Sequence, residues 1–146
     1  MAFPKPAPAQ VIRYSYLWHK DAKRGAEEGS KDRPCAIVLM VQSEDGENIV
    51  TVLPITHTPP HDPADAIEIP HNTKRRMGLD GVRSWVVVTE ANRFYWPGPD
   101  LRPTRSGDAN SVLYGILPYA FFEKVRLAFL KKLEAANSSA LVTRTE

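Results

Sequence analysis

The sequence contains very little cysteine: one residue, Cys35, in a chain of 146. A single thiol excludes an internal disulfide framework and is typical of a protein from a reducing compartment. Cys35 begins the apolar run CAIVLMVQ, where a free cysteine usually serves as a small hydrophobic side chain. A catalytic thiol is the alternative interpretation.

Long apolar runs are missing as well. No stretch approaches the roughly 18 apolar residues that a membrane-spanning helix needs. The opening residues, MAFPKPAPAQ, contain three prolines and no apolar block, so we expect a disordered lead-in at residues 1–10 and no signal peptide. These features predict a cytoplasmic protein that does not associate with membranes.

Strong net charge and familiar ligand-binding motifs are also lacking. The net charge of +2 gives no overall basic field, although cations can still cluster locally. We find no glycine-rich phosphate loop and no serine in a nucleophile-elbow pattern. His57, His61 and Asp62 fall close together in THTPPHD, but two loop histidines fall short of a supported metal site. We therefore expect neither a metal nor a cofactor, with coordination by these histidines as the alternative.

Several short strand patterns are present, followed by one helical pattern. VIRYSYLW, CAIVLMVQ, IVTVLPI, AIEIP and SWVVVTE are rich in β-branched and aromatic residues or alternate in polarity, and SEDGEN between the second and third predicts a hairpin turn. From Leu117 onward the apolar residues follow helical spacing. The chain is thus predicted to be mainly β, a small antiparallel sheet or barrel capped by a C-terminal helix. One domain over residues 11–135 and a flexible tail over 136–146 complete the prediction.

Three residues with chemical potential lie at the ends of predicted strands. Arg33 and Pro34 precede the apolar run that begins at Cys35, Thr56 ends VTVLPIT, and Glu90 ends SWVVVTE. Strand ends of a small barrel gather at common rims, so these side chains are expected to converge. Each also has a simpler interpretation: a solvated arginine, a turn-capping threonine, or a carboxylate paired with Arg93.

A cation, a hydroxyl and a carboxylate together suit phosphoryl transfer within RNA. There the ribose 2′-hydroxyl attacks its own neighbouring phosphate, so the substrate supplies the nucleophile. The protein must accept one proton, donate another, and stabilise the added negative charge on the phosphate oxygens.

The order of motifs resembles the MazF/PemK family of toxin endoribonucleases. The segments that carry the resemblance are EEGSKDRPCAIVL, IVTVLPIT, AIEIP and GLDGVRSWVVVTEANR, and it extends over roughly residues 11–134. The first strand, VIRYSYLW, lacks the Gly-Asp opening common in that family, and Val88 stands where some members carry an arginine.

The resemblance implies an SH3-like barrel of about five to seven antiparallel strands, usually a homodimer. It implies metal-independent, sequence-selective cleavage of single-stranded RNA, and a separately encoded antitoxin partner. The resemblance also implies roles for three residues. Arg33 would hold the phosphate and move a proton, Thr56 would stabilise charge in the transition state, and Glu90 would be the catalytic acidic residue.

Further contacts with RNA are expected from residues around these strand ends: Lys31, His57, Arg75, Arg76 and Arg93. A solvated basic turn is the alternative for Arg75 and Arg76. Phe94, Tyr95 and Trp96 suit stacking on bases, but packing in the core is the favoured interpretation.

Two other functions remain open at this point. One is a toxin on the same barrel that binds a protein target, as gyrase-poisoning relatives do. The other is a non-catalytic RNA-binding or regulatory module.

Overall fold

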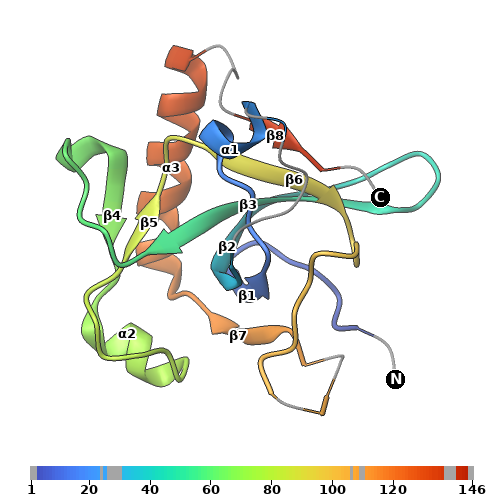
Figure 1. The fold of residues 1–146 in the computed structure, drawn as a ribbon, viewed down its shortest axis with the longest axis horizontal. Coiled ribbons are helices and arrows are strands. Elements are labelled where there is room, and N and C mark those ends of the chain that lie inside the picture. The colour runs from blue at the N-terminus through green and yellow to red at the C-terminus, as the bar shows by residue number, and fades with distance from the viewer. Residues whose placement is uncertain are drawn as a thin grey trace.

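The computed structural model describes residues 3–23, 25, 31–105, 107–108, 111–136 and 141–144. Within them the chain is mainly β, with one long helix near the C-terminus, which confirms the predicted fold class (Figure 1). The described strands belong to one eight-stranded sheet, whose main path runs β4-β5-β3-β2-β1-β7. Its strand pairs are antiparallel apart from β6 and β8, which run parallel.

The centre of the sheet is the hairpin of β2 (Arg33–Gln42) and β3 (Asn48–Thr56). The predicted turn between them is confirmed: Gly46 adopts a positive φ of 85°, and its N–H donates to the Ser43 carbonyl at 3.0 Å. The register shifts between Ile37 and Leu39, which leaves Val38 as an extra residue in β2. Such a bulge bends and twists a strand.

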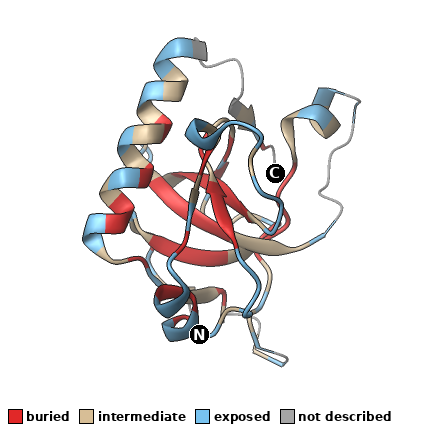
Figure 2. Cartoon of the chain, turned by 90° about the vertical axis from the view of Figure 1, so that its left-hand side faces the viewer, coloured by how far each residue is buried: buried red, intermediate tan, exposed pale blue. Residues whose placement is uncertain are grey.

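Both faces of this hairpin are buried, as its continuous apolar sequence suggests (Figure 2). Successive residues of a strand point to opposite faces. Cys35 and Ile37 therefore join one cluster with aromatic residues of other strands, whereas Ala36 and Val38 join a second cluster beneath the long helix.

The remaining strands extend the sheet on either side of the hairpin. On one side β1 (Gln10–Tyr14) pairs with β2 and with β7 (Leu113–Ile116). On the other, β5 (Trp85–Val87) joins the end of β3 to β4 (Ala66–Glu68), which follows the short 3₁₀ helix η1 (Pro63–Asp65). β6 (Ala91–Tyr95) pairs with the first half of β3.

The predicted C-terminal helix is confirmed as α3 (Tyr119–Ala136), which covers one face of the sheet in Figures 1 and 2. Phe121, Val125 and Phe129 recur every four residues, so they share one face of the helix, and all three are buried in the cluster below it. No described helix is both long and apolar enough to cross a bilayer.

Two short helices lie in polar segments outside the predicted strands. α1 (His19–Lys23) and α2 (His71–Arg76) contain hardly any apolar residues, so neither has an amphipathic stripe. Each consists of little more than one turn. Such a turn depends on its surroundings for stability, and periodicity in the sequence does not reveal it.

The two ends of the chain contact the sheet where they are described. The Trp96 indole donates to the Pro4 carbonyl at 3.1 Å, and Phe3 packs against the aromatic cluster. At the other end β8 (Leu141–Thr143) pairs with β6. Residues 3–9 and 141–144 therefore have defined partners, although the sequence predicted a disordered lead-in and a flexible tail.

Candidate functional site

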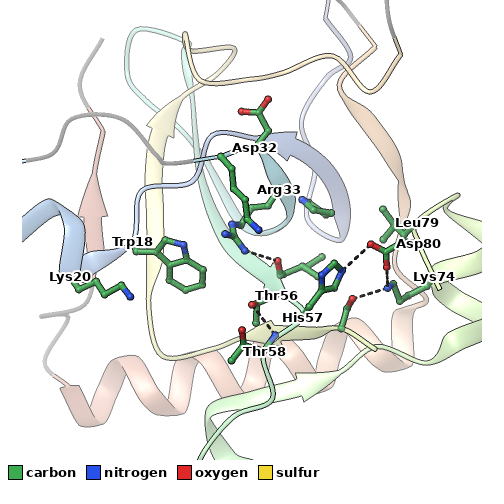
Figure 3. Close-up of a pocket in the computed structure, with 14 residues that line it drawn as sticks. Trp18, Lys20, Asp32, Arg33, Thr56, His57, Thr58, Lys74, Leu79 and Asp80 are labelled. Carbon is green, nitrogen blue, oxygen red and sulfur yellow. Dashed lines mark hydrogen bonds and ion pairs between the residues drawn. The ribbon is translucent and has the colours of Figure 1, made fainter. Parts of the chain in front are cut away.

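A cavity of about 450 Å³ lies at the end of the central hairpin, where β2 begins and β3 ends (Figure 3). Four of the residues predicted to act on RNA line it: Lys31, Arg33, Thr56 and His57. The other lining residues come from the same strand ends, from the segment around α1, from α2 and from the loop that follows α2. They are Trp18, Lys20, Asp32, Pro34, Ile55, Thr58, Lys74, Leu79, Asp80 and Ser84.

Strand register explains why Arg33 and Thr56 meet. Cys35 pairs with Pro54 in the antiparallel ladder, and the same register continued by two residues places Arg33 opposite Thr56. Residues directly opposite each other share a face of the sheet, with Cβ atoms roughly 4.5–5.5 Å apart. Two positions 23 residues apart in sequence thus present their side chains to one cavity.

The Arg33 guanidinium has few partners in the protein. Its Nη1 donates to the Ile55 carbonyl over a long 3.4 Å, and its Nε is buried with no hydrogen-bond partner among the described residues. An unpaired buried donor costs about 1–3 kcal/mol. Trp18 supports the group from one side, with the guanidinium carbon 4.9 Å from the centre of the indole ring. Arg33 is thus held in place while most of its donors remain available to an anion.

The Thr56 hydroxyl is oriented by the turn that follows β3. Its oxygen accepts a hydrogen bond from the Thr58 N–H at 3.2 Å. Because this bond uses a lone pair, the hydroxyl proton remains available to donate to a ligand oxygen. Thr56 can therefore cap the turn and donate a hydrogen bond to an anion at the same time.

The charge around the cavity is unevenly distributed. Asp80 contacts Lys74 at 2.7 Å and His57 at 2.9 Å, and Asp32 lies within 3.6 Å of Arg13 and 3.5 Å of Arg102. In the described part of the chain, by contrast, no carboxylate lies within ion-pair distance of the cationic groups of Lys20, Lys31 and Arg33: the ion pairs found there involve other residues. Three cations therefore give the cavity a local positive charge that the net charge of the protein does not reveal.

Glu90 does not line this cavity. Its Oε1 accepts hydrogen bonds from the Tyr16 hydroxyl at 3.1 Å and from the His19 N–H at 2.8 Å. Burial raises the pKa of Glu90, and these two hydrogen bonds oppose the rise. Tyr16 and His19 flank Trp18, so Glu90 fixes the segment that presents Trp18 to Arg33.

The other predicted RNA contacts are dispersed. Arg75 and Arg76 lie on α2 and bond to Asn72 and Thr73 of the same helix, outside the cavity lining. Arg93, on β6, donates to the Thr143 hydroxyl at 3.1 Å beside the C-terminal strand. The structure thus brings together four of the eight predicted residues and leaves Glu90 and three arginines elsewhere.

Among the aromatic residues of β6 and its end, Phe94 packs in the core. Its ring stacks on Tyr14 with the centroids 4.7 Å apart, and it is buried. Trp96 is partly buried and bonds to the lead-in, while Tyr95 is exposed. Core packing, the favoured interpretation, holds for Phe94.

Several residues of the site were not singled out from the sequence. Trp18 ends the strand pattern VIRYSYLW, and Lys74 and Asp80 fall in the basic segment HNTKRRMGLDG. The sequence around them gives no signal of a site, because their roles depend on how α2 and its loop fold against the end of β3. In the described part of the chain, no cluster of three or more His, Cys, Asp or Glu side chains is arranged to hold a metal ion.

No protein-family model matches the sequence, and no curated protein matches it.

Proposed function

We propose that the protein is a MazF/PemK-like toxin that cleaves single-stranded RNA at the cavity between β2 and β3. The observation that carries the proposal is the placement of Arg33 opposite Thr56, with Lys20 and Lys31 lining the same cavity. The order of sequence motifs from residue 11 to 134 supports it independently. An SH3-like closure of the sheet, a homodimer and a separately encoded antitoxin belong to the same proposal.

The reaction proposed is attack of a ribose 2′-oxygen on the adjacent phosphorus atom. The O2′–P bond forms, the P–O5′ bond breaks, and the products are a cyclic phosphate and a free 5′-hydroxyl. Arg33 and Thr56 would donate hydrogen bonds to the non-bridging phosphate oxygens, where negative charge accumulates in the transition state. Donors already positioned for that charge stabilise it without a cost of reorganisation.

Binding of RNA without cleavage is the second candidate. The placement of Glu90 favours it, because the carboxylate expected to act on the substrate instead bonds to Tyr16 and His19. In that case Arg33 and the nearby lysines would hold phosphates, and the strand would remain intact.

Incubating purified protein with a long single-stranded RNA in EDTA distinguishes the two. We expect the native protein to cut at a short recurring sequence, and Arg33→Ala and Thr56→Ala each to cut roughly 10²–10³-fold more slowly. Arg126→Ala is the matched control, because Arg126 pairs with Glu123 on α3 and does not line the cavity. RNA that is bound but never cut would support the second candidate. Equal cutting by all variants would exclude Arg33 and Thr56 from catalysis.

A further inference from the structure

A lysine, an aspartate and a histidine form a hydrogen-bonded chain from the protein interior to the cavity. Lys74 of α2 is at the inner end, with a side chain only 3% exposed. Its ammonium donates to Asp80 at 2.7 Å, to the Ser84 hydroxyl at 2.7 Å, and to the Val82 carbonyl. An ammonium has three N–H donors, so Lys74 is fully satisfied within the protein. It is therefore not available to a ligand, and it fixes the loop that carries Asp80.

Asp80 connects this buried cation to a histidine. One carboxylate oxygen, Oδ1, accepts from Lys74 and from the Val82 N–H, and the other, Oδ2, lies 2.9 Å from His57 Nε2. The hydrogen bond from Lys74 holds the pKa of Asp80 below its ordinary value of 3.8, so the group is a carboxylate at neutral pH. A carboxylate has no proton to donate, so the hydrogen of the contact with His57 belongs to Nε2.

This contact determines which ring nitrogen of His57 can accept a proton. When Nε2 carries the hydrogen of a neutral imidazole, the lone pair is on Nδ1. His57 directly follows Thr56 and lines the cavity with it, and half of its side chain is exposed. Figure 3 shows Arg33 between Trp18 on one side and His57 with Asp80 on the other.

A purely structural role does not account for His57. Lys74 already holds the loop through Asp80, Val82 and Ser84, and none of those contacts needs an imidazole. The exposed half of His57 adds little to the core. Its position in the cavity lining makes it accessible to a ligand that enters there.

We propose that His57 is the general base of the RNA cleavage, with Asp80 and Lys74 as positioning residues. This inference rests on the proposed function and assigns the proton acceptor that Glu90 does not supply. Nδ1 takes the proton of the 2′-hydroxyl as the O2′–P bond forms. The P–O5′ bond breaks, the departing 5′-oxygen takes a proton from water, and the imidazolium then returns its proton to solvent.

The charged groups around His57 suit this role. Asp80 faces it from the loop after α2, with Lys74 behind Asp80. Lys31 and Arg33 at the start of β2 and Lys20 of α1 line the same cavity. The carboxylate stabilises the imidazolium that forms. The cations hold the scissile phosphate, next to the 2′-hydroxyl that loses its proton.

The test separates cleavage from binding. The rate constant for cleavage is measured on RNA, and affinity is measured by fluorescence anisotropy on the same RNA with a 2′-deoxy nucleotide at the mapped cleavage position. For His57→Gln we expect cleavage to slow by about 10²–10⁴-fold, the usual contribution of a positioned base. Affinity should change less than threefold. Asp80→Asn should slow cleavage by a smaller factor with the same pattern.

The pH profile is the second measurement. A general base works only in its unprotonated form, so the cleavage rate of the native protein should fall toward acid pH. The residual activity of His57→Gln should lack this decrease. His71→Gln is the matched control, because His71 is an exposed histidine at the start of α2 and does not line the cavity.

Each outcome is informative. If Arg33→Ala abolishes cleavage while His57→Gln cuts at the native rate, RNA cleavage stands and the role of His57 is refuted. If His57→Gln loses affinity as much as rate, His57 only binds RNA and the inference also fails. If the native protein cuts no RNA, both the proposed function and this inference are wrong. His57 is half exposed, so its variant should fold, and a thermal melt checks this.

Discussion

At the scale of single residues, burial decides which reactive groups are available for chemistry. Cys35 is completely buried between β1 and β3, and burial raises the pKa of its thiol well above the ordinary value of 9.0. The thiolate is the reactive form of cysteine, so a buried thiol with a raised pKa is inert. This agrees with the interpretation of Cys35 as a small core side chain.

We therefore predict that Cys35 does not react with Ellman's reagent in the folded protein. The reaction should become fast once guanidinium unfolds the chain, with a yield of one thiol per molecule. Measuring the absorbance of the released thiol reagent with and without guanidinium tests this. Rapid labelling of the native protein would mean that Cys35 is accessible and would revive the catalytic thiol as an interpretation.

Glu90 provides a prediction of pH-dependent stability. Burial raises its pKa above the usual value of 4.5, so the folded state holds the proton more tightly than the unfolded state. The contribution of Glu90 to stability should then fall as the pH rises from about 4.5 through the folded-state pKa, and no further loss from this group should follow above it. Glutamine keeps an oxygen for Tyr16 and His19 but does not titrate.

The expected result for Glu90→Gln is a free energy of unfolding that increases relative to the native protein across this interval. Urea titrations at several pH values measure the difference, and contributions from other titrating groups cancel. A difference that is constant with pH, or that decreases, would show that burial does not control this carboxyl group.

At the scale of elements, those whose pattern lies within one continuous segment could be predicted from the sequence. The hairpin of β2 and β3 has its turn and both apolar runs in one continuous segment, and α3 shows its buried face every four residues. Elements that depend on distant partners could not. β7 needs β1 as its neighbour, and β8 is placed by its ladder with β6. Both are short and lack a distinctive pattern of their own.

The candidate site divides in the same way. Arg33 and Thr56 could be paired from the sequence, because they end two strands of one hairpin. Trp18, Lys74 and Asp80 could not, because they reach the cavity only when α2, its loop and the segment before α1 fold against the strand ends. The convergence expected for Glu90 assumed that strand ends share one rim. In the structure Glu90 instead lies just before β6 and bonds to the chain that follows β1.

The docking of α3 can be tested with one helix residue from each face. Phe129 is 2% exposed and lies against the sheet, whereas Leu127 is 57% exposed. Phe129→Ala should lower the free energy of unfolding by about 3–5 kcal/mol, because it removes a buried ring and leaves a cavity. Leu127→Ala should change it by less than about 0.5 kcal/mol. Similar effects of the two substitutions in denaturant titrations would mean that the helix is not packed in this orientation.

At the scale of the whole molecule, Arg144 joins the C-terminal strand to the rest of the sheet. Its guanidinium lies 3.1 Å from the Asp100 carboxylate and donates to the Ser15 carbonyl and the Asn92 side chain, each at 3.0 Å. Both partners of the ion pair are nearly buried. A single side chain thus connects β8, the loop after β6 and the segment after β1.

Arg144→Ala should therefore destabilise the protein by about 3–5 kcal/mol, because it leaves the Asp100 carboxylate buried without its cation. Adding Asp100→Asn to this variant should recover part of the loss, since an amide carries no charge to desolvate. Thermal or denaturant unfolding of the two variants measures both effects. If Arg144→Ala is as stable as the native chain, the C-terminal strand is not held by this contact.

Positive charge is concentrated at the cavity of a protein whose net charge is only +2. Lys20 and Lys31 line the cavity, whereas Lys124 and Lys131 belong to α3. Cations that neutralise RNA phosphates make affinity depend on salt, with a slope of about 0.7 in log–log form for each phosphate of a single strand. Lys20→Ala with Lys31→Ala should reduce that slope by roughly 1.4, two such contributions.

Lys124→Ala with Lys131→Ala removes the same total charge and should leave the slope unchanged. Anisotropy titrations of single-stranded RNA at several salt concentrations compare the pairs. Equal slopes for both would mean that RNA responds only to net charge and that the cavity is not its binding site.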